Sequence, residues 1–131
     1  MISDLLRIEG LRVYYYTRDG VVMAVDNVDL FMKKGETIGL VGESGSGKST
    51  LGRAILRLVP PPGRIISGKI VFDGLNLTEL SEEEMRKIRG KRISMVFQDP
   101  MTSLDPLMKI GDHIVETIMA HETLTREEAE E

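Results

Sequence analysis

The residues of this chain that are best suited to chemistry form one glycine-rich run, GESGSGKST, over Gly42–Thr50. This run matches the pattern G-x-x-x-x-G-K-[ST], in which glycines let successive backbone N–H groups turn toward phosphate oxygens. Lys48 adds a full positive charge for the β- and γ-phosphates of a nucleotide, and the Ser49 hydroxyl can ligate Mg²⁺. The pattern therefore predicts a phosphate-binding loop made of Gly42, Glu43, Ser44, Gly45, Ser46, Gly47, Lys48, Ser49 and Thr50.

The segments on either side of this loop are of the kind that would position it. Thr37–Gly42 is a short apolar run, TIGLVG, which is typical of a buried parallel strand. Lys48–Leu58 carries apolar residues at helical spacing, and the prolines of Pro60–Pro62 end that helix. A helix that starts at Lys48 would direct roughly half a positive charge at the phosphates. The alternative is a Gly- and Ser-rich turn that happens to precede a helix, but the four specified positions and the flanking elements favour the phosphate loop.

Four more segments have the composition of strands, and one has that of a turn. Residues 5–16 and 21–32 are rich in Val, Leu, Ile and Tyr, and Thr17–Gly20 between them has the composition of a turn. These residues predict an antiparallel pair at the start of the chain. Gly68–Phe72 is predicted to be a further strand, and ISMVF at Ile93–Phe97 is predicted to be a buried one.

Two capping boxes and one run of apolar residues at helical spacing predict helices in the second half of the chain. Ser81 is followed three residues later by Glu84, and Thr125 is followed in the same way by Glu128. In each pair the two side chains can bond each other's backbone N–H, which starts a helix. Residues 110–119 place apolar side chains at helical spacing and predict a helix between the two boxes.

Composition excludes several classes of function. The 131 residues are 41% hydrophobic and 29% charged, as in ordinary globular domains, and they contain no cysteine for disulfides or thiolate metal sites. The net charge of −4 lacks the basic excess of a nucleic-acid-binding protein. The first residues carry Asp4 and Glu9 and do not form a secretory signal, and no apolar run approaches the roughly 18 residues of a membrane span.

Three segments of the chain are similar to a known family. LVGESGSGKST, LRLVPPPGRIISGKIVFDG and MVFQDPMTSLDPLMKIGDHIVE resemble the ATP-binding subunits of bacterial and archaeal ABC importers, most of all the oligopeptide/dipeptide branch. The resemblance extends over essentially the whole chain. It implies an α/β fold with a partial phosphate-loop NTPase core (RecA-like parallel sheet), an antiparallel β subdomain and the start of a helical subdomain. The corresponding parts are residues 1–36 (mainly antiparallel β), 37–98 (phosphate-loop core with part of the β subdomain) and 99–131 (Q-loop and start of the helical subdomain).

The resemblance also implies roles for two residues outside the loop. Gln98 follows ISMVF and takes the place of the glutamine that heads the Q-loop, where it would bind Mg²⁺ or the attacking water during catalysis. Without the family match, a loop glutamine in water would be the preferred interpretation. Tyr15 aligns with the aromatic residue that stacks on adenine, and in a strand it faces opposite to Tyr14 and Tyr16. Ordinary strand packing of all three tyrosines is the alternative.

The cofactors and partners are likewise implied by the resemblance. The cofactors are ATP and Mg²⁺. The partners are a second nucleotide-binding subunit, membrane permease subunits reached through the region from Gln98 to His113, and, indirectly, an extracytoplasmic solute-binding protein, with no nucleic acid. The implied location is cytoplasmic, peripheral on the inner face of the cell membrane. The implied function is ATP hydrolysis that drives import of oligopeptides, dipeptides or a similar small solute.

The sequence contains only the front part of the motifs that the family uses. It has no LSGGQ-like signature, no apolar strand that ends in Asp-Glu, and no switch histidine in the right context, since neither His113 nor His121 fits that place. We therefore expect these 131 residues to bind ATP without hydrolysing it. Two alternatives stay open: a non-catalytic truncated nucleotide-binding fragment, and a soluble ABC ATPase that acts on nucleic acid or the ribosome.

Overall fold

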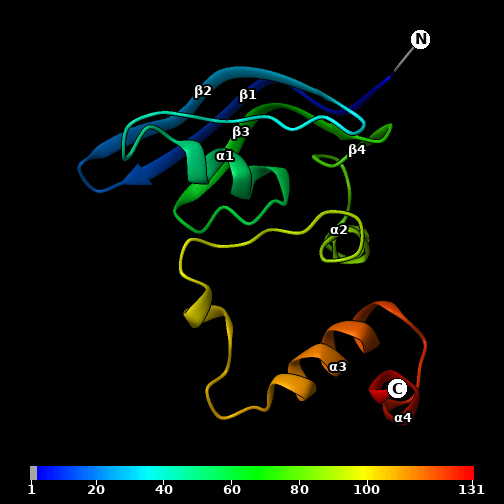
Figure 1. Ribbon diagram of the computed structural model, residues 1–131. Coiled ribbons are helices and arrows are strands. Elements are labelled where there is room, and N and C mark those ends of the chain that lie inside the picture. The colour runs from blue at the N-terminus through cyan, green and yellow to red at the C-terminus, as the bar shows by residue number, and fades with distance from the viewer. Residues whose placement is uncertain (1–2) are drawn as a thin grey trace. The chain divides into compact units, whose positions relative to one another are not determined.

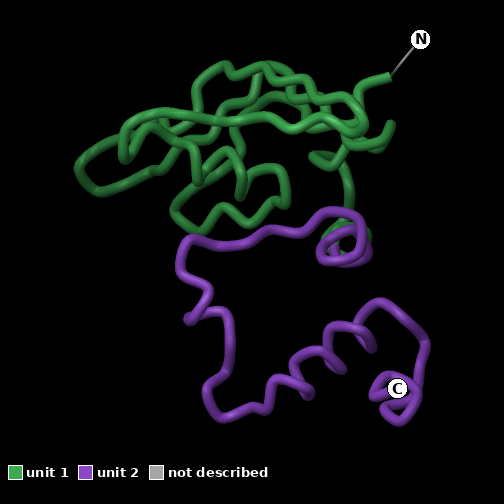
Figure 2. Tube along the Cα trace, in the orientation of Figure 1, with its two compact units in different colours: residues 1–85 green, residues 86–131 purple. Residues whose placement is uncertain are grey.

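The structure is a computed structural model that describes residues 3–131 of the chain. It divides into two compact units, residues 1–85 and residues 86–131, which are coloured separately in Figure 2. The first unit contains an antiparallel sheet and helix α1. The second contains α3, α4 and a short 3₁₀-helix, and α2 spans the boundary.

The sheet of the first unit has four antiparallel strands in the order β2-β1-β3-β4 (Figure 1). The strands are β1 Asp4–Thr17, β2 Gly20–Lys33, β3 Gly63–Phe72 and β4 Leu75–Asn76. The register pairs Thr17 with Gly20, so the predicted hairpin between the first two strands is confirmed. Strand β3 begins earlier than the sequence predicted and pairs with β1 over most of its length.

Irregularities in β1 keep its apolar side chains on one face. A perfect strand alternates every second residue, yet Ile8, Leu11 and Val13 are all fully buried. The pairing register shifts between Ile8 and Leu11, where Gly10 has a φ of 55°. A bulge of this kind inserts one residue and restores the inward direction for the residues that follow. The bulge therefore allows Ile8, Leu11 and Val13 all to point into the core of the sheet.

Helix α1, Lys48–Ile55, packs on the sheet against β1 and β2 (Figure 1). Leu51 and Ala54 are its buried residues, as their spacing in the sequence predicted. The segment that leads from the end of β2 into α1 carries the glycine-rich loop. The sheet and the helix therefore hold the loop from both ends.

The two segments predicted as parallel strands do not form strands. Thr37–Gly42 contains no strand, and Val41 is 95% exposed. Ile93–Phe97 makes only one isolated parallel bridge, between Ile93 and Arg89, and Val96 is 90% exposed. A buried parallel strand requires hydrogen-bonded neighbours, and no strand of residues 3–131 pairs with either segment. The prediction of strand structure is wrong for both segments for this reason.

The second half of the chain is helical and agrees with the predicted starts. Helix α2 is Glu82–Ile88, the 3₁₀-helix η1 is Pro100–Ser103, α3 is Ile110–His121 and α4 is Arg126–Glu130. Both capping boxes are present, at the start of α2 and at the start of α4. No helix of the described residues has the length and apolar character to cross a membrane.

Candidate functional site

The glycine-rich loop takes its shape from close contacts at two of its glycines, and at Gly47 only glycine fits. Gly47 is the N-cap of α1 with a φ of 93°, and a Cβ there would lie 2.1 Å from the carbonyl oxygen of Ala24 in β2. At Gly42 a Cβ would lie 2.7 Å from the Ser46 Oγ. A left-handed φ and a close approach of the backbone both require a residue without a side chain. The loop is therefore seated directly on strand β2.

Lys48 directs its charge into this loop. Its Nζ donates hydrogen bonds to the carbonyl oxygens of Gly42, at 2.7 Å, and Glu43, at 2.5 Å, and to the Ser46 Oγ at 3.0 Å. An ammonium group has three donors, so these oxygens satisfy it completely. The geometry places one full positive charge inside the turn that the sequence predicted to hold phosphates.

The N-terminus of α1 adds to this positive potential. The helix begins at Lys48 and has no acidic residue in its first turn, so nothing on the helix itself neutralises the N-terminal end of its dipole. Ser49 lies exposed on that first turn, and the half-buried Thr50 follows it. Together the loop, the lysine and the helix end form a site suited to a strongly anionic group such as a triphosphate.

Tyr15 lies beside this loop. Its hydroxyl is 3.4 Å from the Thr50 Oγ1, a contact between residues 35 positions apart in the sequence. The Tyr14 hydroxyl instead donates to Asp26 at 2.8 Å, and this hydrogen bond raises the pKa of Tyr14 above its ordinary value. The guanidinium of Arg64 lies 5.4 Å from the centre of the Tyr16 ring. The three tyrosines thus have three different partners, and only Tyr15 contacts the loop helix.

A pocket of 310 Å³ opens between the loop and strand β2. Its walls are mostly apolar, and Asp26 and Lys48 are its charged residues. This volume is within the range of pockets that hold small molecules. Asp26 is a lining residue that the sequence did not indicate, because its place in the pocket wall depends on how β2 passes the loop.

Gln98 belongs to the second unit, whereas the residues described above belong to the first. It is an exposed residue in a bend, and it directly precedes Asp99, whose carboxylate accepts a hydrogen bond from the Met101 N–H at 3.3 Å. This bond caps the 3₁₀-helix η1 in a segment predicted to be a loop. The structure therefore brings Tyr15 next to the helix that follows the glycine-rich loop, whereas the catalytic and metal-binding roles of Gln98 stay predictions.

Clusters of metal-binding side chains were a further possible site feature. Among the described residues, no three His, Cys, Asp or Glu side chains gather closely enough to hold a metal ion. Mg²⁺ usually takes one or two protein oxygens and completes its shell with phosphate oxygens and water. The Ser49 hydroxyl, exposed on the first turn of α1, is compatible with that mode of binding.

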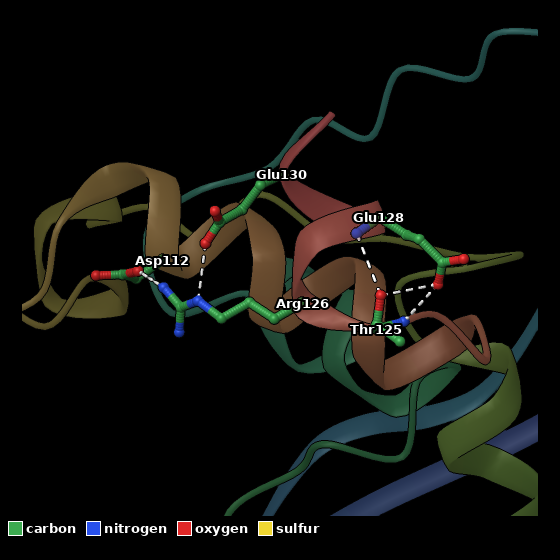
Figure 3. A network of polar contacts seen from close by, with 5 residues as sticks. All are labelled: Asp112, Thr125, Arg126, Glu128 and Glu130. Atoms are coloured by element: carbon green, nitrogen blue, oxygen red, sulfur yellow. Dashed lines mark hydrogen bonds and ion pairs between the residues drawn. The ribbon is translucent and has the colours of Figure 1, made fainter.

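The second unit carries a polar network centred on Arg126. The Arg126 guanidinium bridges Asp112 of α3 and Glu130 of α4, the latter at 2.8 Å (Figure 3). Next to it, Thr125 and Glu128 form the capping box. These bonds stabilise the packing of α4 on α3 and lie among residues with no predicted chemical role. They are part of the scaffold of the second unit.

Comparisons with known proteins identify relatives over nearly the whole chain. Residues 25–131 match the ABC transporter family. The chain is 47% identical to the oligopeptide transport ATP-binding protein OppD of Bacillus subtilis over 129 residues, which are 98% of this chain and 36% of that protein. It is also 47% identical to the dipeptide transport ATP-binding protein DppD of Lactococcus lactis, over 91% of this chain and 34% of the relative. The chain thus spans just over a third of the length of these relatives.

Solved structures show the same fold. The dimeric structure of MJ0796, a bacterial ABC transporter cassette, matches 95% of this chain and 52% of its own, with a TM-score of 0.80 and 27% identity. A post-hydrolysis state of the same cassette, bound to ADP and Pi, matches with a TM-score of 0.81. The family match and the fold match agree with the geometry of the loop: this chain belongs to the ABC transporter family and has the α/β fold of an ABC ATPase cassette.

Proposed function

We propose that this chain supplies the nucleotide-binding part of an ATP-binding subunit that powers import of oligopeptides, dipeptides or a similar small solute. The observation that carries the proposal is the loop geometry, in which Lys48 is held inside a glycine turn at the N-terminus of α1. The peptide substrate rests on the relatives, which are oligopeptide and dipeptide transport ATP-binding proteins.

The residues of the loop would hold ATP by exchanging internal contacts for phosphate contacts. Lys48 releases the carbonyl oxygens of Gly42 and Glu43 and donates to the β- and γ-phosphates instead. Backbone N–H groups of Glu43, Ser44, Gly45, Ser46 and Gly47 surround the phosphates, and the end of α1 stabilises their charge. Mg²⁺, when bound, neutralises charge that develops on the phosphates during hydrolysis.

Three further roles complete the site. The Ser49 hydroxyl ligates Mg²⁺, and Tyr15 stacks on the nucleotide base. Gln98 contributes its side-chain carbonyl oxygen to the metal ion or the attacking water, and as a neutral amide it can leave without stranding a buried charge. In this scheme the Q-loop and the start of the helical subdomain occupy residues 99–131.

The partners follow from the same assignment. The region from Gln98 to His113 would contact membrane permease subunits on the cytoplasmic face of the membrane. This region exposes apolar side chains of the kind found at protein interfaces, with Leu107 and Met101 the most exposed. A second nucleotide-binding subunit would complete the hydrolytic site, consistent with the dimeric cassette to which the fold is similar. A solute-binding protein outside the membrane would act indirectly.

The 131 residues by themselves are proposed to bind ATP without turning it over. They contain no LSGGQ-like signature and no apolar strand ending in Asp-Glu, so they hold neither the group that faces a partner's phosphate loop nor the expected water-activating acid. Binding requires only the loop, Lys48 and the helix end.

Calorimetry with Mg-ATP tests this proposal. Replacing Lys48 by Ala removes a charged hydrogen-bond donor and is expected to weaken binding about 10- to 100-fold. Lys34→Ala is the matched control, because Lys34 is an exposed lysine of the turn after β2 with no place in the loop. Phosphate release measured on the same samples should stay at the level of the Lys48→Ala variant. Equal ATP affinity of the original chain and Lys48→Ala would refute the proposed site.

A further inference from the structure

Three segments that are distant in the sequence meet at the ring of Tyr15. Tyr15 belongs to β1, and its hydroxyl is 3.4 Å from the Oγ1 of Thr50, in α1. In the sheet, Tyr15 is paired with Gly63, the first residue of β3. The side chain is half-buried between these neighbours. Its position is therefore set by the sheet and by the loop helix together.

Gly63 leaves the space that the ring of Tyr15 occupies. A Cβ at this position would lie 2.6 Å from the Cε1 of Tyr15 and 2.5 Å from the Cγ1 of Val59. It would also lie 2.9 Å from the carbonyl oxygen of Pro60. Distances below 3.0 Å force neighbouring atoms to shift. The backbone of Gly63 has no left-handed φ, so the requirement for glycine here is one of space alone.

The turn beneath the ring is held in place. The N–H of Gly63 donates to the Pro60 oxygen at 2.9 Å, and the N–H of Tyr16 donates to the Pro62 oxygen at 3.5 Å. Prolines restrict φ to a narrow range, so the three in this turn leave the backbone few alternatives. A side chain added at Gly63 would accordingly displace the ring of Tyr15 more readily than the turn.

We propose that Gly63 and Thr50 are positioning residues that fix the Tyr15 ring for the nucleotide base. Gly63 lets the ring lie against the sheet, and Thr50 holds its hydroxyl at the first turn of α1. The distance between the base-stacking ring and the phosphate loop is then fixed, so that one nucleoside triphosphate can contact the ring with its base and the loop with its phosphates. This inference rests on the proposed function of the loop and of Tyr15.

The contact with Thr50 also limits what Tyr15 can recognise. With its hydroxyl directed to Thr50, Tyr15 offers the base a ring face and no polar group aimed at the base edge. Stacking on an aromatic face tolerates every base. The ring therefore adds affinity for a nucleotide over its bare triphosphate, and it adds no preference between adenine and guanine.

The main test compares Mg-ATP with Mg-tripolyphosphate, which shares the phosphates of ATP and lacks the base. Base stacking on an aromatic residue contributes about 1–3 kcal/mol, so a displaced ring in Gly63→Ala should weaken ATP binding roughly 5- to 100-fold. The affinity for tripolyphosphate should not change. Gly111→Ala is the control, because a Cβ at that position in α3 meets nothing within 4 Å. An equal loss for both ligands, or no loss for ATP, would overturn the inference.

A double-mutant cycle tests the hydroxyl contact without altering the turn. Tyr15→Phe keeps the ring and removes its hydroxyl, and Thr50→Val removes the other partner. Because 3.4 Å is long for such a bond, each change should weaken ATP binding only about two- to threefold, and the double variant should lose no more than one single variant. Thr50→Ser should restore binding. Additive losses would show that the two hydroxyls act separately and would overturn the role of Thr50.

Different variants distinguish a failure of the proposed site from a failure of the positioning roles. If Lys48→Ala and Tyr15→Ala both leave ATP affinity unchanged, the proposed site is wrong and the inference falls with it. If those variants weaken binding while Gly63→Ala and the cycle do not, the site stands and only the positioning roles are refuted.

Discussion

The two units of this chain are stabilised in different ways. The first unit contributes most of the buried apolar side chains: Leu6, Ile8, Leu11, Val13, Val25, Leu51, Ala54, Leu56, Ile70, Leu77 and Met85. Those of the second unit are Ile88, Val115 and Ala129. Large exposed apolar residues occur in both units, with Val41 in the first and Leu107 in the second among them. Burial therefore holds the sheet and its loop, while the helical unit depends on caps and ion pairs.

This difference follows from how each kind of element finds its partners. The antiparallel strands β1 and β2 are joined by a tight turn and pair with each other directly, and β3 returns beside β1 to complete a shared core. In the second unit, α4 contacts α3 but has only five residues, of which Ala129 is buried. A small contact buries little apolar area, so local hydrogen bonds account for more of the stability there.

The largest expected effect compares two isoleucines. Ile8 is 0% exposed in the sheet core, and Ile110 is 73% exposed at the start of α3. Ile8→Ala should lower the free energy of unfolding by about 2–5 kcal/mol, because it removes buried methyl groups and leaves a cavity. Ile110→Ala should change it by less than about 0.5 kcal/mol. Urea unfolding followed by circular dichroism measures both, and similar losses for the two variants would contradict the contrast.

The next largest effect compares two glycines. Gly47→Ala places a Cβ 2.1 Å from the Ala24 carbonyl oxygen and forces alanine into a left-handed φ of 93°. The backbone conformation alone costs about 1–2 kcal/mol, and the loop must also lift from β2. Gly111→Ala meets no neighbour and replaces a helical glycine, so it should gain up to about 1 kcal/mol. Opposite shifts of the thermal midpoint are expected, and a loss in both variants would show that the second unit is also closely packed.

Local signals in the sequence predicted local structure well. The capping boxes at Ser81 and Thr125 were confirmed because each needs only residues within one turn of a helix. The first hairpin was confirmed for the same reason, since its turn joins the two strands directly. The glycine-rich loop could be recognised for the same reason, because its glycines and Lys48 lie within nine consecutive residues, and its role in phosphate binding stays a prediction.

Features that depend on distant segments could not be predicted in this way. The apolar runs at Thr37–Gly42 and Ile93–Phe97 have strand composition, but a parallel strand needs a neighbour that its own residues do not specify. The contact of Tyr15 with Thr50 and the close approach of Gly63 depend on how three elements pack. The sequence predicted that Tyr15 points to the opposite side of the strand from Tyr14 and Tyr16. It did not predict which residues surround the Tyr15 side chain.

A smaller effect is expected from removing a helix cap in the second unit. The Thr125 Oγ1 accepts a hydrogen bond from the Glu128 N–H at 3.3 Å, and Thr125→Ala should cost about 1 kcal/mol of local stability in α4. The Ala129 N–H donates to the backbone carbonyl oxygen of Thr125 at 3.1 Å, and its hydrogen exchange should become faster when this stability is lost. Thr125→Ser keeps the hydroxyl and should retain the protection. Unchanged exchange in Thr125→Ala would mean that packing on α3, not the cap, holds this helix.

The smallest expected effect is acid weakening of the same helix start. The N–H of Thr125 donates to the Glu128 carboxylate at 2.8 Å, and this bond, with that from the Thr125 hydroxyl, lowers the pKa of Glu128 below its ordinary value. A carboxyl with a lowered pKa in the folded state stabilises that state above the carboxyl's unfolded pKa, and the contribution is lost as the pH falls through the folded-state pKa. The Thr125 amide chemical shift should report this transition. Glu128→Gln keeps a capping side chain that does not titrate, so its amide shift should stay constant over the same range. A transition that persists in Glu128→Gln would show that the acid sensitivity does not come from this cap, which lies beside the ion pairs of Arg126 that hold α4 on α3.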